Sequence, residues 1–210
     1  MTVEVKICGL RDPAMVRRTD EAGANWIGFV FVEQSVRAVT PDAAAALLLP
    51  IRRARPVALL ADADDALIDE VAATGIPVLQ LHGAETPRRV AEVKARTGLE
   101  IWKALGVSSH DDLRAASDLD AADRLLIDAK PPKDAPVTGG HGAAFDWDIL
   151  AGWTPPKPWL LAGGLTPETV AEAVARTGAI AVDVSSGVER TRGWKSADLI
   201  RRFIQTAKAP

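Results

Sequence analysis

Two glycine-rich turns, LLAGGL at residues 160–165 and VDVSSGVE at residues 182–189, each follow a short apolar run near the end of the chain. Glycine lets several backbone N–H groups point at one spot, and such turns bind anions. After the last two strands of an eight-stranded α/β barrel, the usual anion is phosphate. Plain strand-to-helix turns also use glycine for positive φ and serine as a helix cap. Because the two turns are consecutive, we favour a phosphate site.

The rest of the chain repeats the same pattern of an apolar run followed by an alanine-rich amphipathic stretch, which is typical of βα units around a parallel sheet. Strands are predicted at residues 3–8, 26–31, 56–61, 78–82, 101–104, 124–128, 159–162 and 180–184. Helices with proline or acidic starts are predicted at residues 41–53, 65–74, 87–96, 167–176 and 196–207. Several helices end at a glycine, which predicts an internal repeat of roughly twenty residues.

We therefore predict a compact single (β/α)8 (TIM) barrel in the α/β class, forming one domain over residues 1–210; a doubly wound open sheet is the alternative. Two connections depart from the repeat. Residues 32–40 form a long polar loop, and residues 130–153 contain three prolines and the GGHG motif at residues 139–142. Long loops in a compact barrel are usually lids or binding segments.

Composition narrows the classes of function. The 210 residues are 48% hydrophobic with a net charge of −3, and they include no Tyr and only four Phe, which argues against a nucleic-acid surface. No apolar run is long enough to span a membrane, and no signal segment is evident. The single Cys cannot form an intrachain disulfide. We expect a cytoplasmic protein that binds a small anionic molecule, with neither nucleic acid nor membrane as a partner.

Cys8 ends the first predicted strand and precedes Gly9. A free cysteine there is often a small buried core residue. It is also a candidate base or nucleophile, because Lys6 lies on the same strand face and its charge favours the thiolate. Lys6 could equally be a structural lysine paired with a carboxylate such as Asp183. If Cys8 is a base, its thiol pKa is expected below the ordinary value of about 8.5.

Asp128 closes LLIDA at residues 125–129. A carboxyl group at the end of an apolar strand is a candidate general acid, because desolvation raises its pKa. An N-cap or a loop ion pair is the alternative role. Strands one and six lie nearly across the barrel mouth. A substrate between Cys8 and Asp128 could therefore be deprotonated on one side and protonated on the other.

Other candidates lie on neighbouring loops and strands. Arg37, in the loop after strand two, suits a carboxylate if that loop folds over the mouth. His82 shares a strand face with Gln80, and it is either a core residue or a ligand contact. His110 and His141 fall in predicted loops. Because no two histidines have metal-ligand spacing, we predict no metal.

These residues resemble the phosphoribosylanthranilate isomerase family. The resemblance spans the chain through VKICGL at residues 5–10, GANWIGFVF at 23–31, QLHG at 80–83, LLIDA at 125–129, FDW at 145–147, LAGGLTPETV at 161–170 and VDVSSGVE at 182–189. It implies a ribulose-phosphate-binding barrel that catalyses an Amadori rearrangement of N-(5-phosphoribosyl)anthranilate in tryptophan biosynthesis. The resemblance also implies a small phosphoribosyl substrate, no cofactor, and a monomer or homodimer.

The resemblance assigns roles to individual residues. Cys8 becomes the general base and Asp128 the general acid. Arg37 binds the anthranilate, and His82 and Asp183 are further substrate-binding residues. The phosphate lies on backbone and hydroxyl groups of Gly140, Gly142, Gly163, Gly164, Ser185, Ser186 and Gly187.

Two positions depart from the family motifs. Val36 replaces the proline that usually precedes the loop arginine, so the loop loses a fixed φ. His141 replaces the threonine of the usual Gly-Gly-Thr-Gly, which removes a hydroxyl contact and can add charge near the phosphate.

The nearest rival is the histidine-pathway isomerase, which uses an aspartate on strand one and needs a second phosphate site after strands three and four. In this chain those turns read LLADAD and LHGAET, with only Gly83 available. The strand-one cysteine disfavours dual-substrate isomerases as well. Indole-glycerol-phosphate synthase fits less well, because it generally carries an additional N-terminal segment. A metal-dependent epimerase would need more convergent histidines than the three scattered ones of this chain. A non-catalytic phosphosugar-binding barrel is the alternative from a different class.

Overall fold

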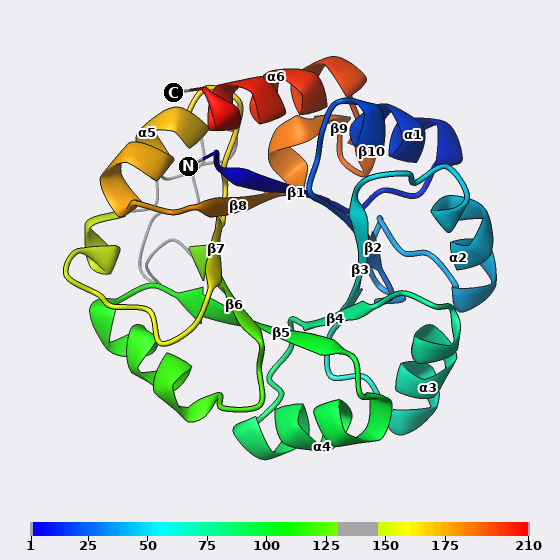
Figure 1. The fold of residues 1–210 in the computed structure, drawn as a ribbon, viewed down its shortest axis with the longest axis horizontal. Helices are drawn as coiled ribbons and strands as arrows, with labels where there is room; N and C mark the ends of the chain where they lie inside the picture. The colour runs from blue at the N-terminus through cyan, green and yellow to red at the C-terminus, as the bar shows by residue number, and fades with distance from the viewer. Residues whose placement is uncertain (1, 130–146, 210) are drawn as a thin grey trace.

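The computed structural model describes residues 2–129 and 147–209. Eight parallel strands form a closed barrel, and the first strand pairs with the last (Figure 1). The strands are β1 (Glu4–Cys8), β2 (Trp26–Val30), β3 (Arg55–Leu60), β4 (Val78–Leu81), β5 (Glu100–Val107), β6 (Arg124–Ala129), β7 (Trp159–Ala162) and β8 (Ala181–Val184). The (β/α)8 prediction is confirmed, and closure between β1 and β8 excludes the open sheet.

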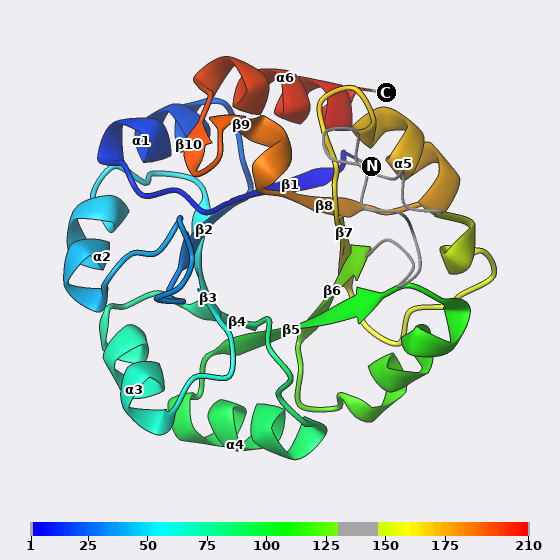
Figure 2. The same cartoon turned by 180° about the vertical axis from the view of Figure 1, so that it is seen from behind.

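Helices surround the barrel on its outside (Figures 1 and 2). They are α1 (Pro13–Glu21), α2 (Pro41–Leu48), α3 (Asp65–Ala73), α4 (Pro87–Thr97), α5 (Val170–Thr177) and α6 (Ala197–Lys208), with 3₁₀ helices η1 (His110–Asp118), η2 (Trp147–Leu150) and η3 (Ser186–Val188). Within the described ranges, no helix is both long and apolar enough to cross a membrane.

Local chemistry explains where the helices differ from prediction. α2 ends at Leu48, five residues before the predicted end, because Pro50 has no N–H with which to continue the helical hydrogen bonds. α1 was not predicted, although Asp12 caps it by accepting from the N–H groups of Ala14 and Met15. His110 begins η1 rather than lying in a loop.

Side chains alternate between the two faces of each strand and so form two cores. The larger core fills the layer between the strands and the helices. The smaller core lies inside the barrel and includes Trp26 and Trp102, whose rings meet edge to face at 5.2 Å. The guanidinium of Arg124 stacks 5.0 Å from the Trp26 ring. Arg124 begins β6, so this cluster closes the amino-terminal end of the barrel and leaves the opposite end for a site.

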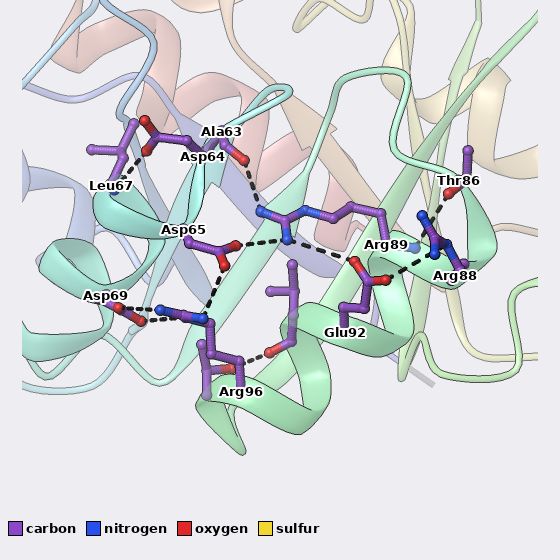
Figure 3. Close-up of polar contacts among 12 residues, drawn as sticks. Ala63, Asp64, Asp65, Leu67, Asp69, Thr86, Arg88, Arg89, Glu92 and Arg96 are labelled. Carbon is purple, nitrogen blue, oxygen red and sulfur yellow. Dashed lines mark hydrogen bonds and ion pairs between the residues drawn. The ribbon is translucent and has the colours of Figure 1, made fainter.

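An ion-pair network joins α3 to α4 on the outer surface (Figure 3). Arg96 forms a two-pronged contact with Asp69 at 2.6 Å and also contacts Asp65. Arg89 bonds to Asp65 and to the carbonyl of Ala63, which lies in the loop after β3. The network ties neighbouring βα units together on the outside of the barrel.

A small hairpin that the sequence did not predict follows η3. Its strands β9 (Glu189–Thr191) and β10 (Trp194–Lys195) are antiparallel and lie beside α1 (Figures 1 and 2). Arg11 stacks 4.4 Å from the Trp194 ring and holds the hairpin against the loop after β1. The hairpin returns the chain from the last glycine-rich turn toward the barrel mouth.

Candidate active site

A cavity of about 370 Å³ opens at the carboxyl ends of the strands. It brings together side chains and turns from β1, β2, β4, β6, β7 and β8. Ten predicted site residues line it: Cys8, Arg37, His82, Asp128, Gly163, Gly164, Asp183, Ser185, Ser186 and Gly187. The remaining two, Gly140 and Gly142, lie outside the described residues, as does His141.

Lys6 lies within the barrel directly beside Asp183, its register partner on β8. The Lys6 Nζ donates to Asp183 Oδ1 at 2.9 Å, and the Lys6 side chain is fully buried. Burial disfavours the lysine charge, but attraction to Asp183 outweighs it and raises the pKa of Lys6. The structural pair anticipated from the sequence therefore exists, and Lys6 is charged at neutral pH.

The thiol of Cys8 occupies space left by Gly28 on β2. A Cβ atom at position 28 would lie 2.8 Å from Cys8 Sγ and 3.1 Å from Lys6 Nζ, so Lys6 also approaches the thiol. Burial raises the pKa of Cys8 above its ordinary value, and the charge of Lys6 opposes this only in part. The expectation of a lowered thiol pKa is therefore wrong for the free protein, because burial dominates and Asp183 offsets part of the lysine charge.

This sign predicts how Cys8 alkylation depends on pH. The thiol stays protonated to higher pH than an ordinary cysteine, so the rate of reaction with iodoacetamide should still be rising above pH 8.5 or so. Lys6→Met removes the stabilising cation and should move the midpoint to still higher pH. Mass spectrometry of Cys8 after timed exposure measures both midpoints. A wild-type midpoint below that of free cysteine would contradict the burial argument.

Arg37 reaches the cavity from the loop after β2. Its Nε and Nη2 donate to the two carboxylate oxygens of Glu189 at 2.6 and 2.8 Å, a paired geometry that fixes the guanidinium plane. The hydroxyl of Ser35 accepts the N–H of Arg37 and shapes the loop. These contacts leave Nη1 of Arg37 for a ligand carboxylate.

Glu189 and Lys195, both on the hairpin, complete this cluster, and sequence reasoning missed them. Burial opposes ionisation of Glu189, but hydrogen bonds from Arg37, Gly193 and Lys195 lower its pKa to about 2. Lys195 also donates to the carbonyl and hydroxyl oxygens of Ser185, at 2.9 and 3.1 Å. The hairpin thus links the arginine loop to the last glycine-rich turn.

Asp128 ends on the cavity wall beside His82. The His82 Nε2 lies 3.2 Å from Asp128 Oδ2, and Gln80 Nε2 lies 2.9 Å from His82 Nδ1. A quarter of the Asp128 side chain is exposed. The strand ends here and the carboxyl group projects into the cavity. Its principal partner among the described residues is the imidazole of His82. The alternative roles of helix N-cap and loop ion pair with an arginine are not seen in this part of the chain.

The two glycine-rich turns lie against one another. Gly163 and Gly164 both adopt positive φ, 93° and 64°, after β7. A Cβ atom at Gly187 would collide with the carbonyl of Leu165, so only glycine allows the turn after β8 to approach this closely. Together the two turns line one side of the cavity, as a shared anion site requires.

Within the described ranges, no group of three or more His, Cys, Asp and Glu side chains is placed to hold a metal ion. A buried thiol, a carboxyl group and two glycine-rich turns at the carboxyl ends of the strands define an enzyme of the (β/α)8-barrel class.

Comparison with known proteins specifies the family within this class. The model of the family N-(5′-phosphoribosyl)anthranilate (PRA) isomerase matches residues 5–206, and this chain belongs to that family. The isomerase of Hyphomonas neptunium is 61% identical over 98% of this chain and 97% of its own length. That of Paracoccus denitrificans is 56% identical over 100% and 99%.

Solved structures agree in fold. The Thermotoga maritima phosphoribosyl anthranilate isomerase superposes with a TM-score of 0.86 at 33% identity, covering 98% of both chains. A second phosphoribosyl anthranilate isomerase structure, in complex with reduced 1-(o-carboxyphenylamino)-1-deoxyribulose 5-phosphate, gives a TM-score of 0.83 at 30% identity, again over 98% of both chains.

Proposed function

We propose that this protein isomerises N-(5′-phosphoribosyl)anthranilate to 1-(2-carboxyphenylamino)-1-deoxyribulose 5-phosphate in tryptophan biosynthesis. The observation that carries the proposal is the shared cavity lined by Cys8 from β1, Asp128 from β6 and the paired glycine-rich turns. A thiol and a carboxyl group that face one ligand from different strands suit a reaction in which one carbon loses a proton and an oxygen gains one.

In the proposed mechanism, Asp128 donates its proton to the furanose ring oxygen. The C1′–O bond breaks, and the nitrogen lone pair forms a Schiff base with C1′. Cys8 acts once its thiol has lost its proton to solvent: the thiolate removes the proton from C2′, and that electron pair neutralises the iminium nitrogen to give an enamine. The enamine takes a proton at C1′ and loses its hydroxyl proton as it becomes the ketone, so the atoms balance without a co-reactant.

The two ends of the substrate fit different parts of the cavity. Its phosphate would bind Gly163, Gly164, Ser185, Ser186 and Gly187, with Gly140 and Gly142 as further predicted contacts outside the described residues. Its carboxylate would bind the free Nη1 of Arg37. His82 and Asp183, which line the space between these ends, remain proposed substrate contacts.

Arg37→Ala is expected to raise KM by roughly 10- to 100-fold with a smaller effect on kcat, because a charged hydrogen bond is worth about 1.5–3 kcal/mol. Arg37→Lys should recover only part of the loss, since lysine lacks the planar fork. Steady-state kinetics measure both, and Arg88→Ala is the matched control because Arg88 is exposed on α4, outside the cavity. An unchanged KM in Arg37→Ala would rule out the proposed carboxylate contact.

The rival substrate with two phosphates would need a second anion site, and the described turns after β3 and β4 do not suit one. The turns after β3 and β4 already use their backbone N–H groups internally. Glu85 accepts from Asp62 and Gly83, and Asp62 accepts from Ala84. Two acidic side chains at this place disfavour an anion, so the single phosphate of the proposed substrate fits better.

The product identifies the function. After incubation of freshly made phosphoribosylanthranilate with the protein, ¹³C NMR should show a ketone carbon in place of the anomeric carbon. A binding barrel would retain the phosphosugar without forming this signal. Absence of the ketone at stoichiometric enzyme would overturn the proposal.

We also propose a cytoplasmic location and a monomeric or homodimeric assembly. The lone Cys8 supports the first. A Thermotoga maritima structure described as monomers of a dimeric isomerase supports both assembly states. Light scattering measures the assembly.

A further inference from the structure

Gln80 is a fully buried polar side chain in the barrel interior. Its amide nitrogen lies 2.9 Å from His82 Nδ1, while its Oε1 has no hydrogen-bond partner among the described residues. A buried amide oxygen without a partner is costly. Retaining a glutamine here, rather than an apolar residue, calls for a reason beyond packing.

The chain of contacts from Gln80 ends at the proposed general acid. His82 lies between Gln80 and Asp128 and contacts each with a different ring nitrogen. When Gln80 donates to Nδ1, the imidazole proton is on Nε2 and is donated to an ionised Asp128. Rotation of the amide by half a turn lets Oε1 accept an Nδ1 proton instead. Nε2 then accepts the proton of a neutral Asp128.

An amide therefore accommodates both charge states of Asp128. A carboxylate at position 80 would only accept, and would fix a proton on Nδ1. A general acid needs both states, because it starts each turnover protonated and ends the acid step ionised. Tautomer exchange through solvent is open to this pair, since His82 and Asp128 are 31% and 25% exposed.

We propose that Gln80 is a positioning residue for Asp128: through His82 it fixes the orientation of the carboxyl group while leaving that group free to be protonated or ionised. This inference rests on the proposed function, in which Asp128 is the acid. The activity of the wild-type protein tests the proposed function, whereas the Gln80 variants test the positioning role.

Other charged groups surround the pair and are the same in every variant. Cys8 from β1, Asp183 from β8 and Arg37 from the loop after β2 line the same cavity. Lys103 on β5 donates to the carbonyls of Leu81 and Gly83, on either side of His82, and to Glu85. Asp62 packs on Gly83, the residue after His82. A change in pH dependence on substitution of Gln80 therefore reports on the amide.

Gln80→Glu is the informative variant. Facing carboxylates at both ring nitrogens, His82 should become an imidazolium and keep Asp128 ionised. We expect kcat at neutral pH to fall by about tenfold or more, since a neighbouring charge shifts an ionisation by one to three pH units. The deficit should shrink as the pH is lowered, because acid restores the Asp128 proton.

Gln80→Met is the matched control, with similar volume and no charge. Its deficit in kcat should be equal at every pH. Nitrogen-15 NMR of labelled histidine gives a readout without turnover, with His82→Gln used to assign the signal. Gln80→Glu should show both ring nitrogens of His82 protonated at neutral pH. A neutral His82 there, or deficits that are the same in both Gln80 variants at all pH values, would overturn the proposal.

A second pair of variants leaves the buried position intact. His82→Gln keeps an amide that can donate to or accept from Asp128, whereas His82→Leu keeps only volume. Loss of orientation costs up to about 100-fold, so we expect His82→Gln to exceed His82→Leu in kcat by about tenfold. Equal kcat values for the two variants would also overturn the proposal.

Discussion

Cys8→Ala is expected to lower kcat by about 10²–10⁴-fold, because removal of a general base typically costs that much. Alanine cannot take the C2′ proton, and the neighbouring Lys6 is charged and paired with Asp183, so it cannot substitute. Steady-state turnover of phosphoribosylanthranilate measures the loss.

The fold should survive this change. Cys8 fills space beside Gly28, and its replacement by alanine leaves the Lys6–Asp183 pair in place. An unchanged melting temperature and an unchanged affinity for the reduced product analogue are the controls. Cys8→Ser should be nearly as inactive, since a hydroxyl ionises far less readily than a thiol. Turnover at the wild-type rate in Cys8→Ala would eliminate the thiol as the base.

Asp128→Asn should have a comparable effect, about 10²–10⁴-fold in kcat, through loss of the acid. The asparagine oxygen can still accept from His82 Nε2, so the side chain should keep its place beside the imidazole. The ring oxygen of the substrate would then leave without a proton, and the Schiff base would not form.

Asp128→Ala separates orientation from proton donation. If the carboxyl group acts by donating a proton, asparagine and alanine should be impaired nearly equally, with the product analogue still bound. Kinetics of both variants over a range of pH provide the comparison. Substantial turnover in Asp128→Asn would show that hydrogen bonding at this position suffices and that the acid lies elsewhere.

Local pattern predicted most of the barrel. The strand β7 was predicted to the residue, and the strand β5 was predicted too short, because Glu100 and residues 105–107 continue the strand beyond the apolar run. Glycines 98 and 178 end their helices in the left-handed conformation, as the repeat indicated. These features depend on neighbours in sequence and could therefore be predicted.

Apart from the Lys6–Asp183 pair, the long-range partners of the site residues could not be predicted. Arg37 pairs with Glu189, 152 residues away, and no local signal indicates that a hairpin returns this carboxylate to the cavity. The direction of the Cys8 pKa shift was missed for the same reason, because it depends on residues far away in the sequence. Lys6 on the same strand was visible, but burial and the offset by Asp183 depend on the closed barrel. Sequence motifs identified the residues around the cavity, whereas their charges and partners required the structure.

The rate at which the wild-type protein consumes phosphoribosylanthranilate is the most direct test of the proposed acid–base isomerisation. The substrate is generated in situ and its fluorescence is followed after addition of wild-type protein, Cys8→Ala or Asp128→Asn. We predict rapid catalytic loss of fluorescence with wild type and a rate close to background with either variant. Two results would contradict the proposed isomerisation: wild-type protein that consumes the fluorescence no faster than buffer alone, or a variant that consumes it as fast as wild type.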